Sequence, residues 1–275
     1  MMLLCSIVFA QDRPVQLDYQ IQKKDTVSLL ITVSFIGNKT GNALVHLPNK
    51  ANGQHDLYKA ISHFHAVSKK TFVDSTNSPD VYLIRYTPGK KIVFSYILSQ
   101  AWRGPLKKSI NSRLVIQNDM FYFDGYSGLV YPDAADSAHI GCKMSYAGFS
   151  NLDFKGNTFF INKDSGNFIV SYHNLMNSFF CAGKYLTKTI KTGDHQIIMA
   201  ESGTQLQSGE RAFSAVSKVI LKQKDFNKND VPDYYFVILL PIAKYTNYPK
   251  TAQNGLVYPE TQVSVTQKFA IALTK

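Results

Sequence analysis

The sequence predicts a mainly β protein in which a β-sandwich is followed by a smaller unit that combines strands with a helix. The 275 residues include 16 Tyr and 18 Phe, and aromatic and β-branched residues favour strands. Short apolar runs separated by turn residues continue from Val15 to about Val170, a pattern typical of sandwiches and barrels. After Phe179 the hydrophobic period changes and one helical segment is indicated.

The first part, residues 14–175, contains most of the predicted strands. Each is rich in β-branched or aromatic residues and stops at a turn signal such as Gly37-Asn38 or Pro88-Gly89. His55–Ala66 is predicted to be a short helix or a long loop. The predicted strands are Val27–Ile36, Ala43–Leu47, Val81–Tyr86, Ile92–Leu98, Leu114–Ile116, Met120–Phe123, Thr158–Ile161 and Phe168–Tyr172.

The second part, residues 176–275, mixes two periods, and the boundary between the parts is expected near residues 172–182. Ser208–Lys224 has apolar residues at helical spacing, with Ser208 as the predicted N-cap. The continuous apolar run Tyr234–Leu240 predicts a buried strand. Further strands are expected at Lys188–Ile190, at Gln196–Ala200 and at the start of Gln262–Leu273, which then turns apolar as a helix would.

Residues 1–10 are similar to a secretory signal. Leu3–Phe9 is apolar and Ala10 supplies a small residue at the expected cleavage site. An exported protein, periplasmic or secreted, is therefore expected. No other stretch approaches the about 20 apolar residues that a membrane helix needs, which excludes an integral span.

Two cysteines, Cys142 and Cys181, remain after removal of that segment. An exported chain with two cysteines can form one disulfide. Buried thiols behave as small apolar side chains, so two free buried cysteines are the alternative. Both possibilities stay open at the level of the sequence.

The net charge of +11 is spread over the chain. The densest groups are lysine pairs such as Lys23-Lys24 and Lys107-Lys108, and Arg is scarce. A nucleic-acid-binding surface usually has a clustered stripe that contains Arg. The pattern therefore favours a solvated lysine surface and excludes nucleic acid as a partner.

Several segments, in this order along the chain, resemble the glycyl aminopeptidase family of zinc metallopeptidases. The resemblance implies an N-terminal β-sandwich followed by a thermolysin-like catalytic domain, of which the chain has the first half. Residue by residue, Asn254-Gly255-Leu256-Val257-Tyr258 is similar to the family's G-G-L-E-H stretch on the strand beside the substrate. The other segments are Val45–Pro48, Leu57–Ile61, Ile92–Tyr96, Phe121–Asp133, Phe180–Tyr185, Ile197–Gly203 and Pro232–Phe236.

The chain departs from the family at the residues that carry chemistry. None of its seven histidines is followed by Glu with a second His three residues later, and that helix holds the zinc and the general base of such peptidases. Val257 stands where the family has Glu, and Val cannot accept a hydrogen bond from a substrate amine. We therefore expect no catalytic residue and no metal in this chain, with zinc only if it is a fragment of a longer enzyme. Gly255, Leu256, Val257 and Tyr258 remain candidate residues for binding a peptide or protein.

Other patterns are incomplete. His63 and His65 share a strand face at a spacing that zinc sites use, with His55 and Asp56 nearby, but no full ligand set is evident. Asp225–Phe236 begins like a calcium loop and lacks its Gly and its final Glu. Gly125-Tyr126-Ser127-Gly128 is one residue short of a nucleophile elbow, and a turn is predicted instead. Trp102, the single Trp, is either a packing residue or a surface for stacking on a sugar or peptide.

Three functions follow as hypotheses. The first is a truncated or degenerate aminopeptidase-like protein that is inactive as given and binds peptide or protein along an open strand edge at Gly255–Val265. The second is an N-terminal fragment of an active zinc aminopeptidase. The third is an exported β-sandwich module that binds carbohydrate or protein.

Overall fold

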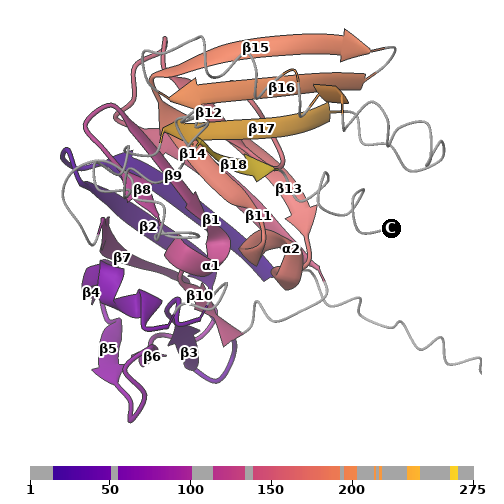
Figure 1. Ribbon diagram of the computed structural model, residues 1–275. Coiled ribbons are helices and arrows are strands. Elements are labelled where there is room, and N and C mark those ends of the chain that lie inside the picture. Colours follow the sequence, from indigo (N-terminus) through magenta and orange to yellow (C-terminus); the bar gives the residue numbers. More distant parts are fainter. Residues whose placement is uncertain are drawn as a thin grey trace, which may run out of the picture.

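The computed structural model is built from sheets, with short helices at their ends (Figure 1). Four sheets contain the described strands, which confirms the predicted mainly β class with a sandwich. The structure describes residues 15–50, 55–100, 114–133, 139–192, 195–202, 214, 217–218, 234–241 and 261–265.

The largest sheet has six strands with the first strand of the chain near its centre. There β1 runs parallel to β11 and antiparallel to β2. Leu17, Tyr19 and Ile21 on β1 are at most 1% exposed, and the residues between them point to the other face. This period of two is what a half-buried sheet requires. The strand order is β13 (Ser165–Val170), β11 (Ile140–Ala147), β1 (Val15–Lys23), β2 (Ser28–Ile36), β7 (Lys91–Ser99) and β4 (Ile61–Ala66).

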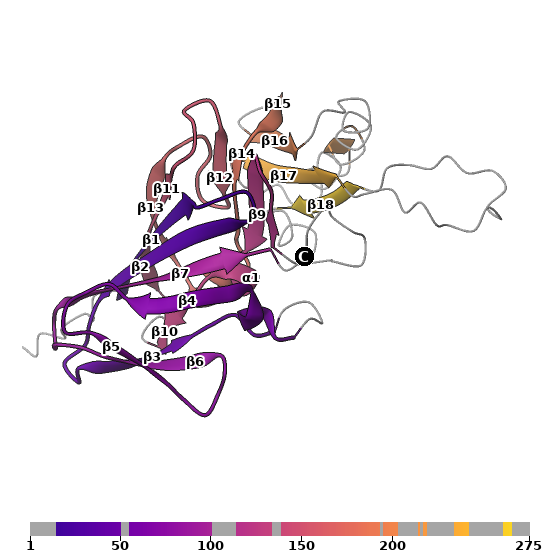
Figure 2. The ribbon, with the colours of Figure 1, turned by 90° about the vertical axis from the view of Figure 1, so that its left-hand side faces the viewer.

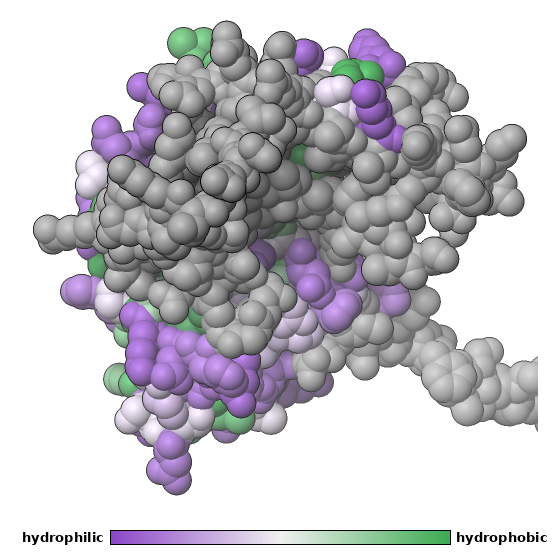
Figure 3. Space-filling view, viewed as in Figure 1, coloured by the Kyte–Doolittle hydropathy of each residue, from purple (hydrophilic) through white to green (hydrophobic). Residues whose placement is uncertain are grey.

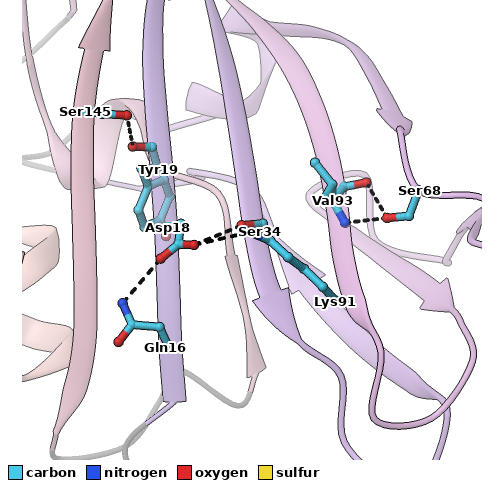
Figure 4. A network of polar contacts seen from close by, with 8 residues as sticks. All are labelled: Gln16, Asp18, Tyr19, Ser34, Ser68, Lys91, Val93 and Ser145. Atoms are coloured by element: carbon cyan, nitrogen blue, oxygen red, sulfur yellow. Dashed lines mark hydrogen bonds and ion pairs between the residues drawn. The ribbon is translucent and has the colours of Figure 1, made fainter. Parts of the chain in front are cut away.

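The outer face of this sheet carries a network of polar contacts between β1, β2 and β7 (Figure 4). Asp18 accepts from Gln16 Nε2 at 3.3 Å and from Ser34 Oγ at 3.3 Å, and Lys91 Nζ lies 3.5 Å from it. Hydrophilic residues also predominate over the lower part of the face seen in Figure 3, with single hydrophobic residues between them.

A second, smaller sheet lies under the six-stranded one, so that the two form a sandwich (Figure 2). Val45 on β3 and Ile84 on β6 are fully buried against Val33 on β2 and Phe94 on β7. These residues belong to the larger of two hydrophobic clusters, called here the first core. The order of the second sheet is β10 (Tyr131–Pro132), β3 (Asn42–His46), β6 (Val81–Arg85) and β5 (Phe72–Ser75).

A third sheet is buried on both faces. On β9, Phe121 and Phe123 belong to the first core, whereas Met120 and Tyr122 belong to a second cluster, called here the second core. Two apolar environments explain why this strand is a continuous apolar run without polar alternation. Its order is β12 (Phe154–Asn157), β14 (Phe179–Gly183), β9 (Met120–Asp124) and β8 (Val115–Ile116).

The fourth sheet covers the far side of the second core, and Figure 1 shows it as the orange and yellow strands. Ala200, Phe236 and Ile238 from this sheet pack there against Phe154 and Phe179 from the third sheet. Ser214 and Ser217–Lys218 are helical, as predicted for that segment, and its other residues lie outside the described ones. The order is β15 (Tyr185–Thr192), β16 (His195–Ser202), β17 (Tyr234–Pro241) and β18 (Thr261–Val265).

Two sequence predictions of elements differ from the structure. His55–Ala66 is helical only over the short 3₁₀ helix η1 (Leu57–Ala60), and its second half is strand β4, which was not predicted. Thr158–Ile161 is a tight turn after β12, because the Asn157 side chain accepts from the backbone N–H groups of residues 159 and 160 at 2.7 and 3.0 Å. Such a side-chain bond offers the backbone an alternative to a ladder.

Two of the described helices are short. α1 (Gly125–Gly128) and α2 (Tyr172–Met176) have one turn each, and both begin at side-chain caps, Asp124 and Ser171. Among the helices that the structure describes, none has the length and apolar character to cross a bilayer.

Candidate functional site

The β18 strand is the outermost described strand of the fourth sheet. It pairs antiparallel with β17, and the pairing runs from Val237 opposite Val265 to Pro241 opposite Thr261. An edge strand directs the amide and carbonyl of every second residue away from its single partner. Such groups can pair with an added extended chain, which is the general mode of strand addition.

The neighbouring strand β17 is held rigidly by the second core. Phe236 is fully buried, and its ring centroid lies 5.3 Å from that of Phe154 and 5.0 Å from that of Phe179. Val237 and Ile238 are also fully buried. The edge strand is therefore supported by close-packed aromatic residues, which pre-organise it for binding.

The residues expected to bind the ligand lie just before this strand. Gly255, Leu256, Val257 and Tyr258 fall outside the described residues, and their binding role stays a prediction. Trp102 and most of the calcium-like segment Asp225–Phe236 lie outside the described residues as well. The structure therefore describes β18, which follows these residues in the chain, and not the residues themselves.

The disulfide considered between Cys142 and Cys181 does not form, and both residues are free and buried. Cys142 on β11 belongs to the first core and Cys181 on β14 belongs to the second. The neighbours of Cys181 on β14, Phe180 and Ala182, point to the first core. The backbone of the third sheet therefore separates the two thiols, and burial raises the pKa of each.

The histidines of β4 do not form a zinc site. A β-bulge between Ser62 and His65 breaks the expected alternation, and His63 has a positive φ of 53°. Both ring nitrogens of His65 have partners, because Nδ1 lies 2.7 Å from the carbonyl oxygen of His63 and Nε2 lies 3.2 Å from Ser95 Oγ. Asp56 pairs with Lys59 at 2.7 Å.

Across the described part of the chain, no group of three His, Cys, Asp or Glu side chains could hold a metal ion. The sequence also lacks the H-E-x-x-H pattern. Within that part of the chain, the residues do not fit the zinc of a metallopeptidase, which needs three protein ligands and an open position.

The sequence did not single out two carboxyl groups whose pKa is raised in the structure. Asp124 caps α1, its Oδ1 accepting from the N–H of Ser127 at 2.8 Å, and burial raises its pKa to about 6. Ser127 is 1% exposed and its Oγ donates to the backbone of Asp124, so it is not a nucleophile. Only the capping pattern Asp124-x-x-Ser127 could have indicated the first group.

Glu201 on β16 is the second of these carboxyl groups. It is 7% exposed, and burial raises its pKa. It alternates with Ala200, which belongs to the second core, so Glu201 points to the opposite face of the sheet. The alternation of β16 shows which residues share a face with Glu201. The sequence does not show that this face is covered, so the burial of Glu201 could not be predicted.

No protein-family model matches the sequence, and no curated protein does. The fold is similar to the crystal structure of an aminopeptidase N family protein from Idiomarina loihiensis, with a TM-score of 0.65 and 15% identity over 80% of this chain and 38% of that chain. A zinc metallopeptidase of the M1 family from Deinococcus radiodurans matches with a TM-score of 0.42 and 11% identity over 84% of this chain and 57% of that one. The chain therefore has the mainly β fold of part of an aminopeptidase N family protein and spans about 38% of that protein's length.

Proposed function

We propose that this chain is an exported, aminopeptidase-like protein that binds extended peptides at the β18 edge and does not hydrolyse them. The observation that carries the proposal is β18 itself, an edge strand on a sheet whose fold is similar to that of an aminopeptidase N family protein. Main-chain pairing with such an edge supplies affinity for a peptide without requiring a particular sequence.

We expect no hydrolysis because the side chains that would bind a metal are missing from the described residues. Metal-dependent peptide cleavage needs a bound cation that activates water and a carboxylate that takes its proton. The sequence has no H-E-x-x-H helix, and the described residues hold no cluster of metal-ligating side chains. Among the described residues, therefore, we find the edge that could hold a peptide and no group that would activate water with a metal.

The first test measures metal content and activity of the purified 275-residue chain. We expect less than stoichiometric zinc after dialysis, and no release of aniline from glycyl- and alanyl-anilides when zinc is added. Stoichiometric zinc together with turnover that a chelator abolishes would contradict the proposal.

The second test uses two neighbouring proline substitutions on β18, Gln262→Pro and Val263→Pro. Adjacent residues of a strand direct their N–H groups to opposite sides, so one substitution removes an outward donor and the other removes a donor to β17. Binding of a fluorescein-labelled Thr-Val-Thr-Val-Thr peptide is followed by anisotropy, and stability by thermal melting. We expect the variant that melts like the parent to lose peptide binding. Equal peptide binding by that variant would exclude β18 as the site.

An alternative is that the chain is an N-terminal fragment of an active zinc aminopeptidase. The aligned share of the Idiomarina loihiensis protein, 38% of its chain, favours this alternative. Reading the gene beyond Lys275 tests it. An H-E-x-x-H motif within about 40 residues, followed by a further Glu, would support the fragment, since these are the metal ligands and the general base.

A further inference from the structure

A cavity of about 490 Å³ lies between β12 and β15, remote in the strand order from β18. It is called here the β12–β15 cavity. Its volume falls in the range of about 300–1,000 Å³ that is usual for small-molecule sites. Its lining residues are Asn151, Leu152, Asp153, Phe154, Lys155, Asn162, Asp164, Tyr185 and Thr187.

The cavity contains a buried charge. The side chain of Lys155 is 6% exposed, and its ammonium lies 2.6 Å from Asp164 Oδ1, on a side chain that is 72% exposed. An ammonium has three donors, and Asp164 is the partner that Lys155 has among the described residues. A buried ammonium is costly unless its donors are used. Lys155 thus offers donors to a ligand that enters the cavity.

The walls of the cavity are fixed by their own hydrogen bonds. Asp153 Oδ2 accepts from the N–H of Ser150 at 2.8 Å, and the N–H of Asp153 donates to the carbonyl of Ser150 at 3.0 Å. The N–H of Asn162 donates to the carbonyl of Lys155 at 2.6 Å. Tyr185 OH donates to the carbonyl of Phe121 at 2.8 Å. The polar groups at the rim are therefore pre-organised.

The turn at Ser150–Asp153 also presents an apolar side chain. Leu152 is 96% exposed, although its N–H is tied to Ser150 Oγ at 3.2 Å. A leucine held outward by a rigid turn loses no packing elsewhere when it contacts a ligand. Together with Phe154 it gives the polar cavity an apolar surface.

The charges of the lining select the class of ligand. One lysine and two aspartates leave the lining with a net charge of −1, so an anionic ligand meets two carboxylates. A cationic ligand has to compete with the ammonium of Lys155 for Asp164. A neutral ligand that both donates and accepts suits the mixture of carboxylates, amides, a hydroxyl and an ammonium.

We propose that the β12–β15 cavity binds a neutral polyhydroxylated ligand, a saccharide of one or two residues. Its hydroxyl groups donate to Asp153 and Asp164 and accept from Lys155 and the Asn amides. The C–H face of its ring packs on Leu152. This site is independent of peptide binding at β18.

The test is titration of the ¹⁵N-labelled full chain with methyl β-glucopyranoside, methyl β-galactopyranoside, cellobiose, glucuronate and glucosamine. We expect a neutral saccharide to shift the amide signals of residues 151–155, 162–164 and 185–187, and to bind more tightly than the charged sugars. No shift with any neutral saccharide, or tighter binding of a charged sugar, would overturn the proposal.

A matched pair of variants on β15 locates the site. Thr187 lines the cavity and Thr189, also exposed and on the same face of the strand, does not. Thr187→Val removes one hydroxyl and keeps the shape and the strand preference, so affinity should fall about fivefold, as for one lost hydrogen bond. Thr189→Val should leave affinity unchanged. Equal effects of the two substitutions would overturn the assignment.

A third variant tests the charge argument. Asp164→Asn keeps an acceptor for Lys155 and brings the net charge of the lining to zero. Neutral saccharide affinity should fall about tenfold through loss of a charged acceptor, whereas glucuronate binding should become tighter. Weaker glucuronate binding in this variant would contradict the selection by charge. Thermal melting of each variant verifies that it is folded.

Discussion

The two cores of this protein differ in how they are enclosed. The first core lies between the six-stranded sheet, the second sheet and one face of the third sheet, and buried tyrosines use their hydroxyl groups there. Tyr19 OH donates to the carbonyl of Val130 at 3.1 Å, and Tyr96 OH donates to that of Gly128 at 2.8 Å. The second core is a smaller cluster between the third and fourth sheets.

The comparison shows that the fourth sheet depends on the third. Most of β15 is exposed, so that strand buries little apolar area of its own. Stability is uneven in proteins, and segments with few buried contacts open first. Among the described strands, β15 and β18 each pair with a strand on one side alone. We therefore expect the fourth sheet to unfold locally before the sandwich does.

The largest effect is expected from Phe236→Ala. It removes the central ring of the second core and should lower the free energy of unfolding by about 3–5 kcal/mol. Amide hydrogen exchange should show loss of protection in β15–β18 ahead of β1, β2 and β7. Phe94→Ala, in the first core, should cost a similar amount but reduce protection everywhere. Uniform loss in both variants would remove the distinction between the cores.

A smaller effect is expected at Asp124, beside the first core. Because its pKa of about 6 lies above the usual 3.8, the native state holds a proton that the unfolded chain releases, and stability falls as pH rises from about 4 to 6. Asp124→Asn keeps a capping oxygen for Ser127 and removes that cost, so it should stabilise the protein at pH 7 by about 1–2 kcal/mol. Urea unfolding at pH 4 and pH 7 measures the difference. An equal effect at both pH values would contradict the assignment.

The smallest effect is expected from Tyr185→Phe. The Tyr185 hydroxyl joins β15 to the carbonyl of Phe121 on the third sheet. Its loss should cost about 1 kcal/mol and should increase exchange in β15 alone. Tyr96→Phe, which removes a donor to Gly128 and an acceptor for the N–H of Val130, is the comparison in the first core. It should increase exchange throughout the sandwich.

The sequence predicted the strands that alternate or are continuously apolar. β2, β3, β6, β7, β9 and β17 lie where apolar periodicity placed them, within one or two residues. β4 was missed because its bulge disrupts the period of two, and β12 because its four residues include Lys155 and Gly156. The buried Lys155 pairs with Asp164, which is nine positions away and carries no local signal.

The candidate sites were less predictable than the fold. The sequence indicated an edge near Gly255–Val265, and β18 is the described part of that edge. The separation of Cys142 from Cys181 depends on which face of which sheet each occupies, and spacing along the chain does not reveal it. The β12–β15 cavity is assembled from three separate segments, and each of them alone is an ordinary polar turn or strand.

The position of β1 has a consequence for biosynthesis. Its parallel neighbour, β11, begins at Ile140, some 125 positions later in the chain. Until the ribosome has released that later strand, β1 presents an uncovered edge to the surroundings. Contacts of such high sequence separation slow folding and leave intermediates prone to aggregation. We therefore expect a nascent polypeptide that ends before β11 to aggregate more readily than the finished chain.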